Sequence, residues 1–226
     1  AMTRLMEEDL TIDYKLDPST NEMILSTLGG LHLDSVVGRL AGTFGVEVET
    51  SVPKISYRET IRKKVKVQGR HKKQSGGHGQ YGDVWIEFEP CVSDDLVFEE
   101  KVFGGAVPKN YFPAVEKGIQ ESCLKGPVAA YPVVGVKAVL YDGSYHPVDS
   151  SEMAFKMATI LAFKKGFMDA SPVLLEPIVS MKVTVPDKYT GDVMGDLNKR
   201  RGRVLGMNPD HNGNTIIEAD VPLLEI

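Results

Sequence analysis

The order of strand and helix patterns is the feature of this sequence that most constrains its fold. Toward the end of the chain, strand patterns at 178–185, 203–207 and 214–221 and a helix pattern at 190–201 follow one another as β-α-β-β. This order is the first two-thirds of the split βαβ arrangement, so we expect a truncated domain without its second helix and last strand. Asn212-Gly213 is a hairpin-turn signal, and Gly202 is expected just after the helix.

Two prolines, Pro53 and Pro172, divide the chain into three regions, 1–53, 54–172 and 173–226. Strands are predicted in the first region at 11–16, 23–28 and 46–50. Apolar residues at helical spacing from Leu33 to Phe44 predict a helix that Gly45 ends. We expect this region, too, to be short of an N-terminal strand and part of a helix. Short strands interleaved with few helices indicate an α+β protein.

The middle region predicts strands at 54–61, 83–89 and 133–141, and the alternation of Lys64-Val65-Lys66-Val67 indicates a further strand with one cationic face. Pro113 suits the first turn of a helix that Gly126-Pro127 ends.

A second helix of the middle region is expected after a turn at Asp142-Gly143. Asp149 is its predicted N-cap, with Glu152 as the capping-box partner. Gly166 is expected to end it, and its apolar side is predicted to comprise Met153, Met157, Ile160, Leu161 and Phe163.

Charge is distributed unevenly along the chain. The net charge of −5 argues by itself against nucleic-acid binding. However, residues 61–82 contain no acidic side chain and seven basic ones, namely Arg62, Lys63, Lys64, Lys66, Arg70, Lys72 and Lys73. Charge runs are more often solvated surface, but the absence of carboxylates from this stretch of an acidic chain favours local binding of phosphate.

The basic segment leads into a glycine loop at 77–82 that fits GxGxxG. A dinucleotide site needs a helix after this motif, whereas here a strand is predicted, so no helix N-terminus would face a pyrophosphate. Two interpretations stay open. One is a flexible hairpin tip, and the other is an RNA-contacting tip, in which glycines let the backbone approach phosphates beside Lys72, Lys73, Gln74 and Gln80.

The sequence contains no persuasive catalytic or metal site. His146 lies in a loop without a nucleophile and an orienting acid, and the five histidines form no ligand cluster. Cys91 and Cys123 lie far apart and outside any CxxC pattern, which argues against a disulfide framework or a zinc site and fits a cytosolic setting. No GxxxxGK[ST] motif and no apolar run of about 20 residues are present.

Several strings resemble the elongation factor G family, in the family's own order. They are LHLD (31–34), KQSGGHGQYG (73–82), PAVEKGIQE (113–121), GSYH (143–146), VDSSEMAFK (148–156), LLEPI (174–178) and GDVMGDLNKRRG (191–202). The resemblance implies a partial domain III at 1–53, a complete domain IV at 54–172 and a partial domain V at 173–226. It also implies that ferredoxin-like partial domains flank a ribosomal-protein-like domain with a left-handed βαβ crossover, against the usual handedness.

The resemblance further implies that loops 73–80 and 143–148 form a domain IV tip that contacts tRNA and mRNA in the decoding region. The implied tip contacts are Lys72, Lys73, Gln74, Ser75, Gly76, Gly77, His78, Gly79, Gln80, Tyr145 and His146. Lys199, Arg200, Arg201 and Arg203 end a helix, where the helix dipole favours cations, and contact with ribosomal RNA is a second interpretation.

For the whole protein, the resemblance implies a cytoplasmic, monomeric factor that binds both ribosomal subunits, tRNA and mRNA and no membrane. GTP and Mg²⁺ would be bound by an N-terminal domain outside this chain, so the chain itself is expected to hold no cofactor and to be no enzyme. The alternatives are a ribosomal protection factor, a recycling factor, or a small-molecule enzyme with a phosphate-binding glycine loop. Gly30, His78 and Pro147 depart from the family's usual residues and indicate a paralogue.

Overall fold

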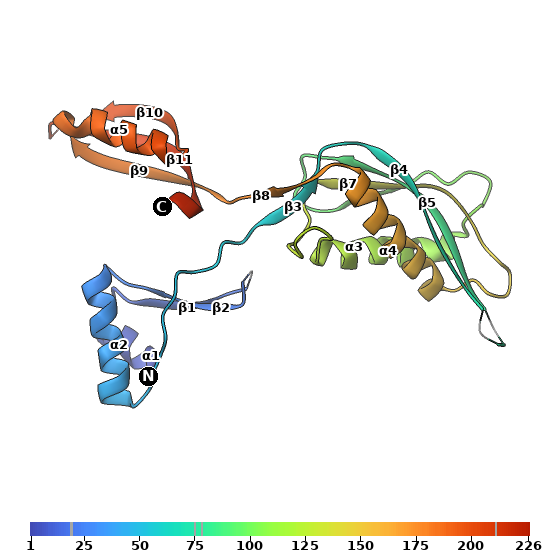
Figure 1. The fold of residues 1–226 in the computed structure, drawn as a ribbon, viewed down its shortest axis with the longest axis horizontal. Helices are drawn as coiled ribbons and strands as arrows, with labels where there is room; N and C mark the ends of the chain where they lie inside the picture. Colours follow the sequence, from blue (N-terminus) through green and yellow to red (C-terminus); the bar gives the residue numbers. More distant parts are fainter. Residues whose placement is uncertain (19, 75, 78, 211) are drawn as a thin grey trace. The chain divides into compact units, whose positions relative to one another are not determined.

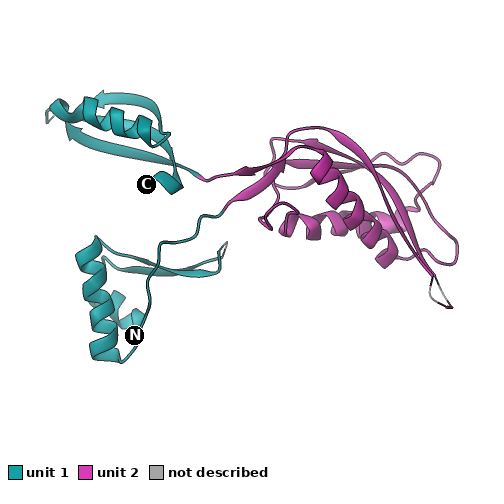
Figure 2. Ribbon diagram, in the orientation of Figure 1, with its two compact units in different colours: residues 1–56, 178–226 teal, residues 57–177 magenta. Residues whose placement is uncertain are grey.

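The computed structural model describes residues 1–18, 20–74, 76–77, 79–210 and 212–226. Its contacts form two compact units, one of residues 57–177 and one of residues 1–56 with 178–226 (Figure 2). Small sheets carry one or two helices each, which confirms the predicted α+β class. The division into three domains at residues 53 and 172 stays a prediction.

Residues 1–56 contain two helices and a two-stranded sheet. The elements are α1 (Met2–Glu8), β1 (Asp13–Asp17), β2 (Glu22–Ser26) and α2 (Gly30–Phe44). Leu5, Ile12, Val36 and Leu40 form the buried core. α2 ends at Gly45 with φ 63°, as predicted. The strand predicted at 46–50 is wrong, because this segment pairs with no other strand in the described residues and alternation alone cannot satisfy a strand's backbone groups.

A four-stranded sheet forms the centre of residues 57–177 (Figure 1). Its order is β4-β5-β7-β6, with β4 (Val65–Lys73), β5 (Gln80–Pro90), β6 (Val97–Glu100) and β7 (Val136–Ser144). The helices α3 (Phe112–Leu124) and α4 (Glu152–Asp169) lie on one face. β6 and β7 pair in parallel, and α3 lies between them in the chain, so the three elements form the expected βαβ unit. The left-handed crossover of this unit stays a prediction.

α4 approaches the sheet through small residues, and its predicted apolar side is largely wrong. Met153 and Leu161 are 58% and 46% exposed, whereas Ala154, Ala158 and Ala162 are fully buried. Alanines allow the helix backbone to come close to β4 and β5, while Met153 and Leu161 face solvent. The remaining buried residues of α4 are Phe155, Thr159, Phe163, Gly166 and Phe167, which places Gly166 inside the helix and not at its end.

The strands β3 (Arg58–Ile61) and β8 (Pro172–Leu175) pair antiparallel and join the beginning and end of the middle unit. Glu59 on β3 is fully buried. Its carboxylate accepts hydrogen bonds from the backbone N–H groups of Val128, Ala129 and Tyr131 at 3.0, 2.7 and 3.1 Å. These donors satisfy the buried charge and fix the loop between α3 and β7.

Residues 178–226 have the predicted β-α-β-β order. The elements are β9 (Ile178–Pro186), α5 (Thr190–Lys199), β10 (Arg203–Pro209) and β11 (Asn214–Pro222), with short 3-10 helices at Asp187–Tyr189 and Leu223–Glu225. The strands pair antiparallel in the order β10-β11-β9 around Leu197 and Ile217. After α5, Arg201 takes the left-handed conformation with φ 57°, one residue before the predicted Gly202.

Candidate nucleic-acid interface

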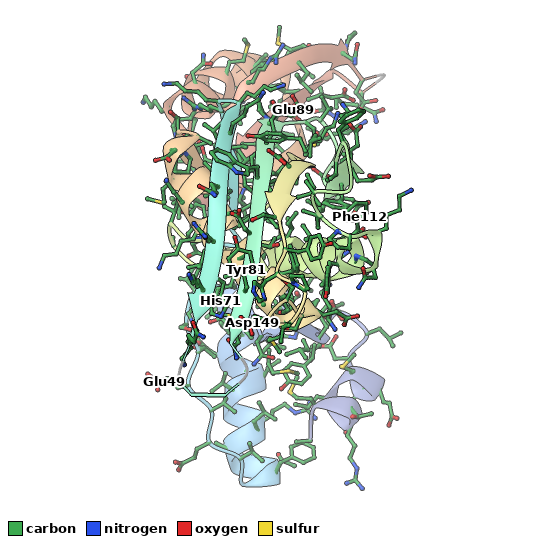
Figure 3. All side chains as sticks on the ribbon, turned by 90° about the vertical axis from the view of Figure 1, so that its right-hand side faces the viewer. Glu49, His71, Tyr81, Glu89, Phe112 and Asp149 are labelled. Atoms are coloured by element: carbon green, nitrogen blue, oxygen red, sulfur yellow. The ribbon has the colours of Figure 1, made fainter. Side chains whose placement is uncertain are left out.

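Two loops that are distant in the sequence meet at one end of the four-stranded sheet. β4 and β5 form a hairpin whose last pair is Lys73 with Gln80. β7 runs beside β5 and ends where Ser144 pairs with Asp83, so the residues after it lie next to the hairpin. We call residues 72–74, 76–77, 79–80 and 145–149 the tip. His71, Tyr81 and Asp149 lie close together at this end of the sheet (Figure 3).

Asp149 connects the two loops of the tip. Its Oδ1 atom accepts a hydrogen bond from the Gly79 N–H at 3.0 Å, and its carbonyl oxygen accepts one from the Tyr81 N–H at 2.8 Å. A Cβ atom on Gly79 would lie 2.9 Å from the Asp149 carboxylate, which would have to shift to make room for it. The next residue, Ser150, donates from Oγ to the Tyr81 carbonyl oxygen at 2.8 Å.

The predicted capping role of Asp149 is therefore wrong. α4 begins at Glu152, and Ser151 immediately before it accepts a hydrogen bond from the Ala154 N–H at 3.1 Å. A cap must lie directly before the helix to reach these N–H groups, and Asp149 lies two residues too early. The predicted turn at Asp142-Gly143 is also wrong, because both residues belong to β7.

His146 is held by backbone groups of its own loop. Its Nδ1 atom lies 3.3 and 3.1 Å from the N–H groups of Val148 and Asp149, and 3.4 Å from the Asp149 carboxylate. Nδ1 can accept hydrogen bonds from the two N–H groups only when it carries no proton, whereas an ion pair with the Asp149 carboxylate would require a proton on Nδ1. Two backbone donors face Nδ1, which fits the tautomer with a bare Nδ1 atom. Nε2 then carries the proton, and the side chain is 50% exposed, so it can donate to an external acceptor.

A chain of polar side chains lies beneath the tip and links the three strands. The Tyr81 hydroxyl is 2.7 Å from Ser144 Oγ, which donates to Asp83 Oδ2 at 2.7 Å. Gln68 donates from Nε2 to the other carboxylate oxygen of Asp83 at 2.8 Å. Because Asp83 is only 6% exposed, these bonds satisfy a nearly buried charge and rigidify the base of the tip.

Some charges of the basic run are paired with carboxylates, and others are not. Lys64 contacts Glu87 at 2.7 Å and Glu89 at 3.1 Å, and Lys66 contacts Glu87 at 3.5 Å. The hydrogen bond from Lys64 lowers the pKa of Glu87, which therefore stays ionised. Lys72 and Lys73 are exposed and have no carboxylate partner in the described part of the chain.

The structure brings the predicted tip residues together at the surface. Lys72, Lys73, Gln74, Gly76, Gly77, Gln80, Tyr145 and His146 are exposed, and Gly79 is half-buried. Ser75 and His78 lie outside the described residues. No sequence pattern indicated a role in the tip for His71, whose Nε2 lies 2.8 Å from Gln80 Oε1. The connecting role of Asp149 was missed as well, because a bond to Gly79 across the fold leaves no local pattern.

The second predicted cluster lies at the end of α5 and the start of β10. Arg200 contacts Asp196 at 2.8 Å, and Arg201 contacts Glu225 at 3.0 Å. Lys199 and Arg203 are also exposed. Carboxylates of residues 178–226 therefore already contact both arginines.

The described residues offer no site for metal or nucleotide chemistry. Within the described ranges, no group of three or more His, Cys, Asp or Glu side chains is placed to hold a metal ion. The glycine loop is followed by β5 and not by a helix, so it lacks the N–H groups that bind a pyrophosphate. No helix among the described residues is long and apolar enough to cross a membrane.

Three protein-family models match consecutive parts of the chain. They are elongation factor G, domain III, at residues 1–52, elongation factor G, domain IV, at residues 53–171, and the elongation factor G C-terminus at residues 173–226. An elongation factor G-like protein of Thermotoga maritima is 49% identical over all 226 residues, which are 33% of that protein.

A solved structure has a similar fold. A crystal structure of a Thermus thermophilus protein superposes with a TM-score of 0.85 at 49% identity, over 99% of this chain and 33% of that one. The chain thus spans about a third of the length of the relatives it matches.

Proposed function

Because the chain belongs to the elongation factor G family, we propose that it is the ribosome-binding part of a translation factor whose tip enters the decoding region and promotes tRNA–mRNA translocation. The observation that carries the proposal is the meeting of two exposed loops around Asp149, beside cations without carboxylate partners in the described residues. GTP hydrolysis, in this proposal, belongs to another domain of the whole factor.

The proposed mechanism is a bias on the position of the tRNA–mRNA duplex. The tip would occupy the space that the duplex leaves and contact it with Lys72, Lys73, Gln80 and His146. Contacts that form only in the translocated state stabilise that state and so oppose backward movement. The bonds of Asp149 to Gly79 and Tyr81 support this role, since an ordered tip loses less entropy on binding.

Single-turnover translocation by the full-length factor tests the proposal. Gln80→Ala and His146→Ala each remove a polar contact, and a lost hydrogen bond of about 1 kcal/mol corresponds to roughly fivefold slower translocation. Gln120→Ala, an exposed glutamine on α3, is the matched control and should leave the rate unchanged.

Unchanged rates in both tip variants would remove these residues from translocation. Normal translocation with slower ribosome splitting by the same variants would instead favour the recycling alternative. The same purified factor and ribosomes serve for both assays, translocation and ribosome splitting.

A further inference from the structure

The side chains on the solvent face of the four-stranded sheet change in kind along the strands β4 and β5. α3 and α4 cover the other face, so side chains that alternate away from the helices form this face, where most are half-buried or exposed and Asp83 is buried. The outward residues of β4 are paired across to those of β5 as Lys66 with Glu87, Gln68 with Trp85, Arg70 with Asp83, and Lys72 with Tyr81. Paired charges therefore lie far from the tip, whereas aromatic rings and cations lie close to it.

Two aromatic side chains lie together on this face. Trp85 is the chain's one tryptophan, and its ring centroid is 6.4 Å from that of Tyr141. The register shifts between Trp85 and Ile86, which brings both Tyr141 and Asp142 opposite Trp85. Trp85 and Tyr141 are both half-buried. Tryptophan is usually placed where its large apolar surface is covered, so a ring on an uncovered sheet face is available to a partner.

Two cations of the edge strand β4 lie beside tyrosine rings on this face. Lys66 Nζ lies 5.2 Å from the Tyr141 ring centre, and the Arg70 guanidinium lies 5.3 Å from that of Tyr81. Arg70 is exposed and has no ion pair with a carboxylate in the described residues.

The carboxylates on the same face are partly engaged. Both oxygens of Asp83 accept hydrogen bonds, and Glu87 contacts Lys64 and Lys66. Asp142 is exposed and accepts a hydrogen bond from the neighbouring Gly143 N–H. A phosphate is therefore repelled from β7 and attracted to β4, the edge strand.

We infer that this face is a second RNA-binding surface, on which an unstacked base lies against Trp85 and Tyr141 while its phosphate contacts Arg70. Adjacent strands lie about 4.8 Å apart, so a nucleotide with its phosphate over β4 has its base over β5. Single-stranded RNA fits this surface because a paired base has no free face to offer to an aromatic ring. The inference rests on the proposed function, since it takes RNA as the partner, and extends it beyond the tip.

Intrinsic fluorescence gives a direct test, because all tryptophan emission of the chain comes from Trp85. The 226-residue chain is titrated with a single-stranded RNA hexamer and with an RNA duplex at equal phosphate concentration. We expect saturable quenching by the hexamer and little change with the duplex. Unchanged emission at concentrations where the anisotropy of a labelled hexamer reports binding would overturn the inference, and so would equal quenching by the duplex.

Variants identify the groups involved. Tyr141→Leu should weaken hexamer binding by about fivefold to a hundredfold, as expected for loss of one stacking ring. Arg70→Ala should reduce the slope of log affinity against log salt concentration by about 0.7, the value for one phosphate contact on a single strand. Trp85→Phe keeps an aromatic face and should bind within a few-fold of the parent chain, as measured by anisotropy.

Matched controls lie elsewhere in the chain. Tyr189→Leu removes another exposed tyrosine, with Lys188 Nζ 4.7 Å from its ring centre, and Lys165→Ala removes an exposed charge of α4. Both should leave affinity unchanged, and a loss equal to that of Tyr141→Leu would overturn the inference. If Tyr141→Leu fails to fold by circular dichroism, Arg70→Ala decides the test, because an exposed side chain can be removed without loss of the core.

The two proposals fail separately. Gln80→Ala and His146→Ala change the tip and should leave the quenching of Trp85 intact. Quenching together with normal translocation in these variants would contradict the proposed function alone. Slow translocation in these variants, without quenching of Trp85 in the parent chain, would contradict the sheet surface alone.

Discussion

At the scale of single residues, Asp149 determines the shape of the tip. One side-chain oxygen and one backbone oxygen of this residue accept hydrogen bonds from two residues of the opposite loop, Gly79 and Tyr81. A hydrogen bond to a charged acceptor contributes more than one between neutral groups. The tip is consequently a connected pair of loops, although its residues lie about 70 positions apart.

Replacing Asp149 should loosen the tip without unfolding the sheet. Asp149→Ala removes the acceptor of the Gly79 N–H, and we expect hydrogen exchange at Gly79 to become roughly tenfold faster, from the loss of a bond of about 1.5 kcal/mol. Asp149→Asn keeps an oxygen acceptor and should restore most of the protection. Asp142→Ala, whose carboxylate contacts its neighbour Gly143, serves as the control. Equal exchange in the alanine and parent proteins would contradict this role.

At the scale of elements, the contact of α4 with the sheet depends on the absence of side chains. A Cβ atom on Gly69 of β4 would overlap the backbone oxygen of Ala158, and one on Gly82 of β5 would overlap that of Ala154. The helix and the two strands are therefore packed backbone to backbone at these points. Such a contact cannot relax by a change of rotamer.

The variant Gly69→Ala should lower the free energy of unfolding by about 2 kcal/mol or more, because α4 must move away from β4. Gly38→Ala is the matched control, since Gly38 lies inside α2 with nothing within 4 Å of the added Cβ. That substitution should stabilise its helix by about 0.5–1 kcal/mol. Urea denaturation measures both changes, and a neutral Gly69→Ala would show that the contact is not tight.

Ion pairs connect the strands on the solvent face. Lys137 of β7 contacts Glu89 at 3.2 Å and Glu99 at 3.0 Å, and Lys64 contacts Glu89 at 3.1 Å. Hydrogen bonds from Lys64 and then Lys137 lower the pKa of Glu89, and one from Lys137 lowers the pKa of Glu99. A lowered folded-state pKa stabilises the fold above the unfolded pKa, and this stabilisation is lost as the pH falls through the folded value.

The urea midpoint should therefore fall between neutral pH and about pH 3, below the ordinary glutamate pKa. Lys137→Gln removes the cation that Glu89 and Glu99 share. The urea midpoint of this variant should therefore fall less between neutral pH and about pH 3 than that of the parent protein. Lys165→Gln, on the exposed side of α4, should retain the full fall. An identical pH dependence in all three proteins would show that the surface ion pairs contribute nothing measurable.

Local patterns predicted most elements, and long-range contacts explain the failures. The helices at α2, α3 and α5 and the strands at β5, β7, β9 and β11 follow from periodicity and from Gly or Pro signals. Which side of α4 is buried depends on Gly69 and Gly82, which are distant in the sequence. Glu59 looks like any charged strand residue until the loop at 128–131 surrounds it. The exposed cations of the tip were predictable, whereas the bond that orders it was not.

At the scale of the whole molecule, an acidic chain carries unpaired positive charge at the tip. The net charge is −5, and Lys72 and Lys73, which lack a carboxylate partner in the described residues, belong to the tip. The tip therefore attracts RNA locally, although the net charge of the chain is negative. This arrangement favours binding in one orientation over indiscriminate adhesion to nucleic acid.

The salt dependence of RNA binding should report this arrangement. Lys72→Ala or Lys73→Ala should each reduce the slope of log affinity against log salt by about 0.7, because each removes one phosphate contact. Lys64→Ala on the same side of the hairpin should change it less, since Glu87 and Glu89 already neutralise that charge. Equal slopes for all three variants would contradict a tip-centred contact.

The position of β4 at the edge of its sheet has a further consequence, for solubility. An edge strand exposes unpaired backbone groups that another chain can extend, and lysines along it discourage this addition. Lys66 and Lys72 stand on this strand, so neutralising them removes an electrostatic barrier to aggregation as well as a phosphate contact. Variants that remove these lysines of β4 should accordingly be less soluble than the parent protein.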